Sequence, residues 1–359
     1  CEARSSSWHG LSVAGIVAAR VNNNAGMAGV NWATRLLPIR VAGMCGADMI
    51  DIVEAMRWAA GLSSINGVTN PTPAKVINVS FGSKESCGPT YQSVINELRT
   101  AGVVVVAAAG NEHRGVARPA NCQNVVSVAA LNRDGFKATY SNFGPEVTVS
   151  TVGGDPGPGW GSTDGGAWGA ALEDAGILTL HNTGTTTTGA SDYRNYAGTS
   201  FSSPITAGVV ALMLDANPNL TPAQIIEGLQ VSARPHVQST RIGACSGNNP
   251  GRCICTTATC GQGILDAGEA VQYAVAKLTS SPYVRPPLLP ENIDSAEVIT
   301  AVSLASADRP ANSVEVSATS RGGEGGGGGG ALSPVGLMAL GLLASASVLA
   351  DRSRRTAGR

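Results

Sequence analysis

The sequence predicts an α/β fold in which helices cover both faces of a mostly parallel central sheet. Four segments read as strands and are almost entirely apolar, a pattern typical of parallel strands buried on both faces. Segments with helical spacing lie between them, and the repetition of strand, helix and strand favours a layered α/β domain. The expected strands are residues 35–41, 74–81, 101–110 and 124–131.

Helices are expected before, between and after these strands. The first begins at His9. Pro218 ends a later one and Thr221 caps the next, since proline stops a helix and threonine is a common N-cap. The other segments with helical spacing, two of which end at a glycine, are residues 48–61, 90–102, 199–218 and 221–233.

Composition limits the class of protein. The chain has 359 residues, enough for one large α/β domain with a sizeable core. Its formal net charge is −1 and only 14% of its residues are charged, so it lacks the basic surface that nucleic-acid binding requires. No nucleic-acid partner is therefore expected.

The chain divides into four parts. Residues 1–276 hold the strand and helix patterns and form the expected domain, and residues 277–330 are rich in proline and glycine, as linkers are. Residues 331–350 carry no charge, and a helix of that length spans about 30 Å, the thickness of a bilayer core. The basic tail at 351–359 favours a cytoplasmic C-terminus and an external domain.

The apolar segment 331–350 has a second interpretation as a buried core helix. The glycine-rich linker that precedes it argues against this, because a long flexible linker does not position a helix in a core. The glycine run, the apolar span and the arginine cluster together resemble the C-terminal sorting signals of bacterial surface proteins. This resemblance implies a tail that contacts the membrane or the sorting machinery. It also implies a chain that is secreted or held in the cell envelope of a bacterium.

The cysteines indicate an oxidising compartment. Their even number and wide spacing suit disulfide bonds. The cluster at residues 245–260 also allows a metal site, but no histidine lies close by and the spacing is not the C-x-x-C of zinc sites. Disulfides are the preferred interpretation for the eight cysteines, which are Cys1, Cys45, Cys87, Cys122, Cys245, Cys253, Cys255 and Cys260.

The strongest chemical signal surrounds Ser200, which follows a Gly-Thr turn and begins a helix. A serine there exposes its hydroxyl beside unpaired backbone N–H groups that stabilise developing negative charge. Taken alone, Ser200 fits a simple N-cap equally well. Two other segments favour catalysis. One begins at His9, which starts a second helix. The other ends at Asn111, which directly follows an apolar strand. The carboxyl ends of parallel strands converge on one crevice, and there the side-chain amide of Asn111 is placed to donate to an oxyanion.

Together these segments resemble the subtilisin-like serine peptidases, from His9 to about Ala276. The resemblance rests on four motifs in the order of that family: "HGLSVAG" from His9, "VINVSFGS" at 76–83, "AAAGN" ending at Asn111 and "GTSFSSP" around Ser200. It implies a three-layer subtilisin-like fold and the hydrolysis of peptide bonds.

The resemblance implies a role for each matched residue. Ser200 is the nucleophile, His9 is the general base and later the general acid, and Asn111 forms the oxyanion hole with the Ser200 amide. A peptide lies along the cleft as an added strand. The walls of the main specificity pocket, which carry no charge and so favour uncharged side chains, are expected to be Ser80, Phe81, Gly82, Ala108, Ala109 and Gly110.

The sequence departs from the family in two minor places. The usual H-G-T-H motif reads H-G-L-S from His9, so that the residue three positions on is Ser12. The segment 154–176 is longer than the family's usual connection and is expected to form a surface loop near the cleft.

The larger departure concerns the acid of the triad. The family order is Asp, His, Ser, with the Asp at the end of the first strand. Glu2 lies too close to His9 to come from that strand, and Asp48 and Asp51 fall in a helical pattern. The expectation is a chain that lacks its first strand, the Asp and any signal peptide or prosegment, and that has at most residual activity in this form.

The segment 19–30 resembles the calcium-binding loop of the family. On that resemblance Asn23 is the side-chain ligand, with backbone oxygens of Val21, Ala25 and Met27 around it. A plain Asn-Gly turn is the alternative. No cofactor is required for the chemistry.

Two disulfide pairs are expected outside the cluster. Cys87 follows the cleft strand and Cys122 precedes the next strand, so these two should approach each other near the sheet edge. Cys1 with Cys45 is the remaining pair.

The sequence therefore predicts a secreted serine endopeptidase that acts on polypeptides through a Ser200 acyl-enzyme, with its own prosegment upstream. The alternative is a catalytically inactive pseudopeptidase or binding module that keeps the cleft and does no chemistry.

Overall fold

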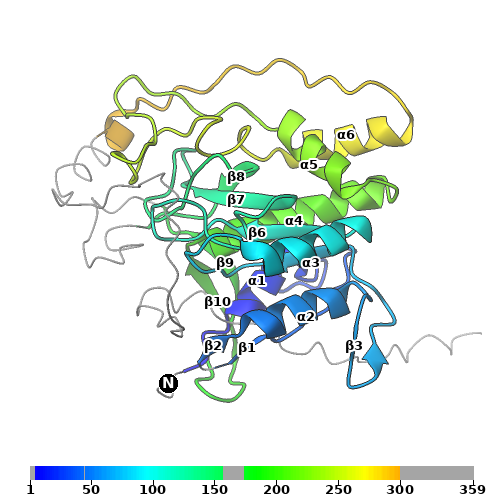
Figure 1. The fold of residues 1–359 in the computed structure, drawn as a ribbon. Helices are drawn as coiled ribbons and strands as arrows, with labels where there is room; N and C mark the ends of the chain where they lie inside the picture. Colours follow the sequence, from blue (N-terminus) through cyan, green and yellow to red (C-terminus); the bar gives the residue numbers. More distant parts are fainter. Residues whose placement is uncertain (1–4, 44, 157–173, 300–359) are drawn as a thin grey trace, which may run out of the picture.

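A four-stranded parallel sheet forms the centre of the computed structural model, which describes residues 5–43, 45–156 and 174–299. The sheet has the spatial order β5-β6-β7-β8, and every neighbouring pair is parallel. Figure 1 shows β6, β7 and β8 side by side. The predicted α/β fold with a parallel sheet is thus confirmed. Its strands are β5 (Val76–Val79), β6 (Val104–Ala108), β7 (Val125–Leu131) and β8 (Val149–Val152).

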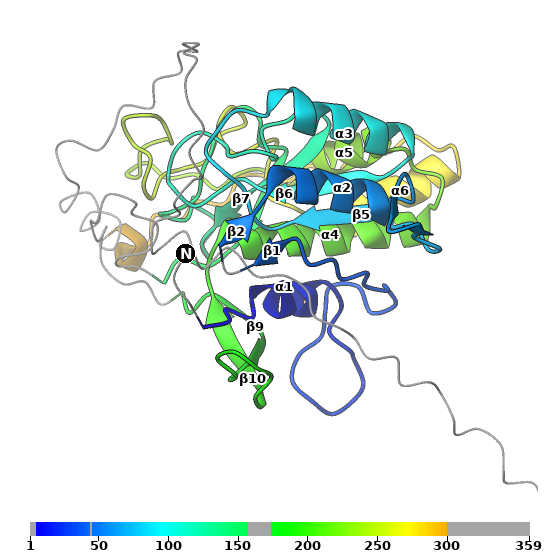
Figure 2. The same cartoon turned by 60° about the horizontal axis from the view of Figure 1, so that its bottom comes forward.

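Helices lie on both faces of this sheet (Figure 2). Along β6, Val105 and Ala107 pack in one core, and Val104 and Val106 pack in the other. Because successive side chains of a strand point to opposite faces, a strand between two cores has no polar positions. One core contains α2 (Met49–Ala59) and α3 (Gly88–Thr100), and the other contains α4 (Thr199–Ala216), α5 (Pro222–Val231) and α6 (Ala267–Leu278).

Polar side chains cap the starts of α2, α5 and α6. The Asp48 carboxylate accepts a hydrogen bond from the Ile50 N–H, which gives this acid a structural role at the start of α2. Thr221 and Gln224 form a reciprocal capping box at α5. The first helix, α1 (His9–Ala18), begins at His9 as predicted.

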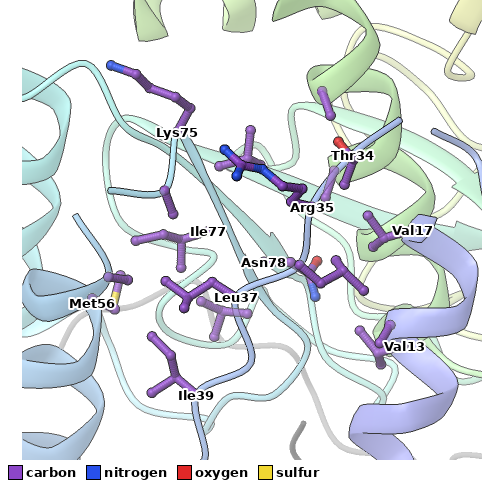
Figure 3. A pocket seen from close by; sticks show the side chains of 18 of the residues that line it. Val13, Val17, Thr34, Arg35, Leu37, Ile39, Met56, Lys75, Ile77 and Asn78 are labelled. Carbon is purple, nitrogen blue, oxygen red and sulfur yellow. The ribbon is translucent and has the colours of Figure 1, made fainter. Parts of the chain in front are cut away.

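The predicted strand at 35–41 is wrong, since these residues form no strand. Among the described residues, the only strand pairing near this segment is the antiparallel one between β1 (Ala42–Gly43) and β2 (Gly46–Ala47). A cavity of about 810 Å³ is lined by residues 33–37 on one side and β5 on the other (Figure 3). An apolar segment becomes a strand only if a neighbouring backbone accepts its hydrogen bonds, and here the cavity separates it from β5.

An antiparallel hairpin that the sequence did not predict lies beside α1 (Figure 2). It pairs β9 (Ile177–Asn182) with β10 (Ser191–Tyr196), with Tyr196 opposite Ile177. β10 is polar and mostly exposed, so it lacks the apolar run used to recognise the central strands. A smaller ladder joins β3 (Ser64–Ile65) to β4 (Val68–Thr69). Residues 157–173 of the predicted surface loop lie outside the described residues.

The chain beyond α6 packs on the domain up to residue 299. The Tyr283 hydroxyl donates to Glu269 at 2.8 Å, and the Arg285 guanidinium lies 3.2 Å from the Asp266 carboxylate. The boundary expected at 276–277 stays a prediction, and the segments 331–350 and 351–359 lie outside the described residues. Within the described ranges, no helix has the length and apolar character needed to cross a bilayer.

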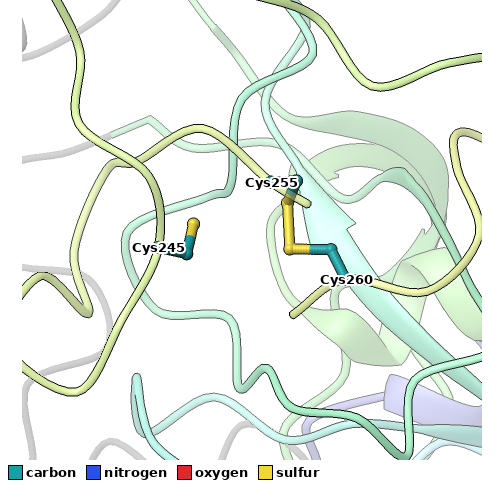
Figure 4. A group of neighbouring side chains, drawn as sticks. All are labelled: Cys245, Cys255 and Cys260. Atoms are coloured by element: carbon teal, nitrogen blue, oxygen red, sulfur yellow. A yellow bond between two sulfur atoms is a disulfide. The ribbon is translucent and has the colours of Figure 1, made fainter. Parts of the chain in front are cut away.

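Disulfide bonds hold the loops around the sheet. The predicted Cys87–Cys122 bond is present, and Cys45 is also disulfide-bonded, while Cys1 lies outside the described residues. The cluster at 245–260 contains two bonds, Cys245–Cys253 and Cys255–Cys260. Three of its sulfur atoms lie within 4.8 Å of one another (Figure 4), but sulfurs joined in disulfides are not thiolates and do not ligate a metal.

Candidate active site

Ser200 is the second residue of α4 and is buried, with 3% of its surface exposed. Gly198 precedes the helix at φ 149°, a backbone conformation that side chains disfavour, and its N–H donates to the Gly153 carbonyl. The Ser200 hydroxyl donates to the Ser80 carbonyl at 2.9 Å. The nucleophile candidate is therefore tied to the end of β5.

Asn111 lies against the first turn of α4, far from it in sequence. Its Oδ1 accepts two hydrogen bonds from Thr199, one from the N–H and one from the hydroxyl, each at 2.9 Å. These bonds fix the amide so that its Nδ2 is the group left to donate. The backbone N–H of Thr199 donates to Asn111 Oδ1, and the backbone N–H of Phe201 donates to the Gly198 carbonyl. The N–H between these two in the chain is that of Ser200.

The loop that carries Asn111 is braced by Asn142. The Asn142 side chain accepts from the N–H groups of Glu112 and Arg114 and donates to Glu112 Oε2 at 2.7 Å. Gly110 has φ 108°, and a Cβ there would stand 2.2 Å from Asn142 Nδ2, so this position requires glycine. The loop is thus held in one conformation.

A buried lysine holds the turn that leads to Asn142. The Lys137 ammonium donates to the carbonyls of Ala138, Thr139 and Ser141 at 2.8, 3.2 and 2.8 Å. Burial lowers the pKa of Lys137 to about 7. Its three hydrogen bonds offset part of the cost of burying the amine.

A chain of side chains also joins β5 to α4. The Ser203 hydroxyl donates to Asn78 Oδ1 at 2.6 Å, and Asn78 Nδ2 donates to the Ser80 hydroxyl at 2.8 Å. The Ser80 hydroxyl in turn donates to the Ser200 carbonyl at 2.9 Å. Together with the bond from the Ser200 hydroxyl to the Ser80 backbone, this network fixes the start of α4 against the sheet.

His9 is the first residue of α1 and is 3% exposed. Its ring meets the Phe201 ring edge to face, with centroids 5.5 Å apart, and Phe201 is the neighbour of Ser200. Trp8, which precedes the helix, has a left-handed backbone that a bulky residue rarely adopts, and its indole N–H donates to the Gly184 carbonyl. The hairpin thus holds the entry to α1.

Ser12, the departure from the usual histidine motif, also binds this hairpin. Its hydroxyl donates to the Leu180 carbonyl at 2.7 Å, and the Thr179 hydroxyl donates to the Ser12 carbonyl at 2.6 Å. Both partners lie on β9. The helix of His9 is therefore packed by specific contacts despite the departure.

The cavity between residues 33–37 and β5 reaches the start of α1, where His9 lines it. Asp215 is the one carboxylate among the residues that line this cavity, and it accepts from Asn31 Nδ2 at 2.7 Å. It lies fifteen residues beyond Ser200 on α4, which corresponds to about 22 Å along a helix. Asp215 is therefore at the far end of α4 from Ser200.

The expected pocket walls follow two adjacent parallel strands. β5 and β6 pair with Val79 opposite Ala107, so residues 80–82 and 108–110 lie at the same carboxyl end of the sheet. Ser80, Ala108 and Ala109 are buried, and Gly82 lies against the Arg118 carbonyl. The structure places the six residues together, and their part in substrate binding stays a prediction.

The loop at 21–27 offers few ligands for calcium. Asn23 Oδ1 accepts from the Ala25 N–H at 3.2 Å, as in a simple Asx turn, and the segment contains no carboxylate. Calcium takes six to eight oxygens, so the four predicted ligands do not by themselves complete a site.

Several residues that support the site were missed by sequence reasoning. The sequence pattern places Thr199 in a turn and assigns no role to Asn78, Asn142 or Glu112. Each acts through partners 28 to 125 positions away in the chain. Short polar side chains of this kind carry no periodicity, so a single sequence offers no signal for such contacts.

Comparison with known proteins identifies relatives of this chain. A model of the subtilase family matches residues 2–251. An extracellular protease of Xanthomonas campestris pv. campestris is 42% identical over 277 residues, which are 76% of this chain. An extracellular basic protease of Dichelobacter nodosus is 35% identical over 62% of this chain. The chain spans only 41% and 35% of the lengths of these two relatives.

The solved structures include a similar fold. A structure of proteases from Pseudoalteromonas arctica PAMC 21717 superposes with a TM-score of 0.62 and 39% sequence identity. The match covers 76% of this chain and 73% of that one.

Proposed function

Because the chain belongs to the subtilase family, we propose that it is an extracellular serine endopeptidase that cleaves polypeptides through an acyl-enzyme on Ser200. The observation that carries this proposal is the placement of Ser200 and Asn111. A buried hydroxyl at a helix N-terminus lies beside an amide whose oxygen is already bound by Thr199. This arrangement supplies a nucleophile and donors for an oxyanion at one point.

In the proposed reaction, Ser200 Oγ attacks the carbonyl carbon of the peptide bond while His9 accepts the hydroxyl proton. The Ser200 N–H and Asn111 Nδ2 stabilise the oxyanion that forms. His9 then donates the proton to the leaving amine, and water hydrolyses the ester by the reverse sequence. Since a hydroxyl has one proton, the bond from Ser200 to the Ser80 carbonyl must break and the hydroxyl must rotate toward His9.

We propose that the acid of the triad enters on an extended segment through the cavity beside β5. The cavity borders His9 at one end, and its one described carboxylate lies at the far end of α4. In subtilisin, loss of the acid alone costs about 3 × 10⁴ in turnover. Residues 1–359 by themselves are therefore expected to retain only residual turnover.

The substrate is proposed to bind as an added strand along residues 80–82 and 108–110. These positions carry no charge, which favours uncharged side chains at the cleaved bond. Secretion is supported by the disulfides and by two relatives that are named extracellular proteases. The prosegment, the role of the tail and retention in a bacterial envelope stay predictions, as does the catalytically inactive alternative.

Labelling by a fluorophosphonate probe tests the proposal. The folded chain is incubated for hours at high probe concentration, so that a rate lowered by about 10⁴ is still measured. Mass spectrometry is expected to find the adduct on Ser200 and to find none in Ser200→Ala. Ser202→Ala, a neighbour in the same helix turn, serves as the matched control and should label like the unaltered chain. If the folded chain is not labelled, the proposal that it is an enzyme is wrong. If residues 1–359 show near-normal turnover, the expectation that they retain only residual activity is wrong.

A further inference from the structure

An aromatic stack connects the hairpin to His9. Phe201 lies between two rings: it stacks on Tyr196 with centroids 5.0 Å apart and planes at 22°, and it meets His9 edge to face at 5.5 Å. Stacked and edge-to-face pairs have preferred geometries, so each ring restricts the orientation of the next. The orientation of the His9 ring thus depends on Tyr196 through one intervening side chain.

Tyr196 is itself fixed by a hydrogen bond. Its hydroxyl lies 2.6 Å from His181 Nδ1, within the same hairpin. His181 is buried, whereas the neighbouring Tyr193 on β10 is 42% exposed. A tyrosine held at both its ring face and its hydroxyl has little freedom to rotate.

The same hairpin holds the backbone of the helix that carries His9. Ser12 exchanges hydrogen bonds with β9, and Trp8 donates to the carbonyl of Gly184 at the hairpin end. With the backbone of α1 fixed by these bonds, the ring of His9 keeps only its side-chain rotations. Those rotations are the ones that the Phe201 contact restricts.

We propose that Tyr196 and His181 are positioning residues that orient the His9 imidazole through Phe201. The inference rests on the proposed function, because it takes His9 to be the base that accepts the Ser200 proton. Without the Tyr196–His181 hydrogen bond, the Tyr196 ring moves, Phe201 follows, and His9 spends less time in the orientation that accepts the Ser200 proton. A catalytic base displaced in this way lowers the rate of the chemical step while substrate binding is kept.

The test uses histidine-labelled protein, because the chain has only four histidines. Tyr196→Phe removes the hydroxyl and keeps the ring, and Tyr193→Phe makes the same change three residues away on the same strand. The ring carbon–hydrogen signals of all four histidines are recorded by NMR. Tyr196→Phe is expected to shift the His9 signal and leave those of His113 and His236, which report an intact fold. Tyr193→Phe should shift none of these three.

The same variants are then labelled at Ser200 with the fluorophosphonate probe. Loss of one hydrogen bond predicts a rate lower by roughly threefold to tenfold for Tyr196→Phe and for His181→Leu. Their double variant should be no slower than either one, because both remove the same bond. His181→Asn, whose amide oxygen can accept from the tyrosine near the position of Nδ1, should restore most of the rate.

Unchanged His9 signals and unchanged labelling in Tyr196→Phe overturn the inference. Equal effects of Tyr193→Phe and Tyr196→Phe overturn it as well, since a general loosening of the hairpin would then be the cause. Failure of the proposed function gives a different result: the unaltered chain does not label at all, while the His9 signal still reports whether Tyr196 orients the ring.

Discussion

The Ser200 side of the candidate site and the His9 side are held in different ways. Asn111 accepts two hydrogen bonds from Thr199, the neighbour of Ser200, and Ser200 exchanges hydrogen bonds with Ser80 at the end of β5. His9 is on a helix that packs between α4 and a partly exposed hairpin, and a cavity borders it. One side is anchored in the central sheet, and the other depends on a peripheral element.

This difference shows that the two sides of the candidate site are supported by different parts of the fold. The position of Ser200 follows from the sheet, so changes at the surface should leave it in place. The position of His9 depends on its contact with Phe201 and on the bonds between α1 and β9. Substitutions on the Ser200 side should therefore act on chemistry or on global stability, and those on the His9 side should act more locally.

The largest expected effect is the loss of Ser200 labelling when Asn111 is substituted. Asn111→Asp keeps the oxygen that Thr199 binds but replaces the Nδ2 donor with an acceptor. Labelling of Ser200 by the fluorophosphonate probe should fall by about 10²–10³-fold, the usual cost of one oxyanion-hole donor. The rate of Ser200 labelling in Asn111→Ala should fall by a similar factor. A rate for Asn111→Asp within threefold of the unaltered chain would show that this amide does not donate to the oxyanion.

The next effect concerns Lys137, which holds the turn behind Asn142. Lysine in an unfolded chain has a pKa near 10.4, whereas burial lowers the pKa of Lys137 to about 7 in the folded chain. Between these values the unfolded chain binds one more proton, so the free energy of unfolding rises with pH from about 7 to about 10. The slope reaches up to about 1.4 kcal/mol per pH unit.

Denaturant unfolding at pH 7, 8.5 and 10, in a Ser200→Ala background to prevent self-cleavage, measures this slope. Lys137→Met should remove the rise, although it also destabilises the fold by leaving three carbonyls without their donor. Lys75→Met, at an exposed lysine, is the control and should keep the rise. The same pH dependence in Lys137→Met would assign the rise to another group.

The smallest expected effect lies on the His9 side. Ser12→Ala removes a buried hydrogen bond to the Leu180 carbonyl and should lower the free energy of unfolding by about 1–2 kcal/mol. Ser93→Ala, at an exposed serine of α3, should change it by less than about 0.5 kcal/mol. Urea unfolding of both variants gives the comparison. Equal values would mean that the bond from Ser12 to β9 does not hold α1.

Prediction from the sequence succeeded where the signal is local. The strands β6 and β7 follow from apolar runs, and the starts of α2 and α5 follow from capping residues within a few positions. Residues 35–41 have an equally apolar pattern and form no strand, because strand formation depends on a partner at the right distance. The hairpin was missed for the opposite reason: its strands are stabilised by each other and by α1, with little apolar character in β10.

The sequence by itself determined the layered fold and singled out Ser200, His9 and Asn111 as the candidate site, because periodicity, turn residues and the order of the motifs can be recognised without a structure. Only the tertiary structure decided how these residues are held. The bonds from Thr199 to Asn111 and from Ser200 to Ser80 span 88 and 120 positions. The support of His9 by the hairpin likewise joins segments about 170 positions apart. Such contacts form only when folding brings distant backbones together, which a local pattern does not encode.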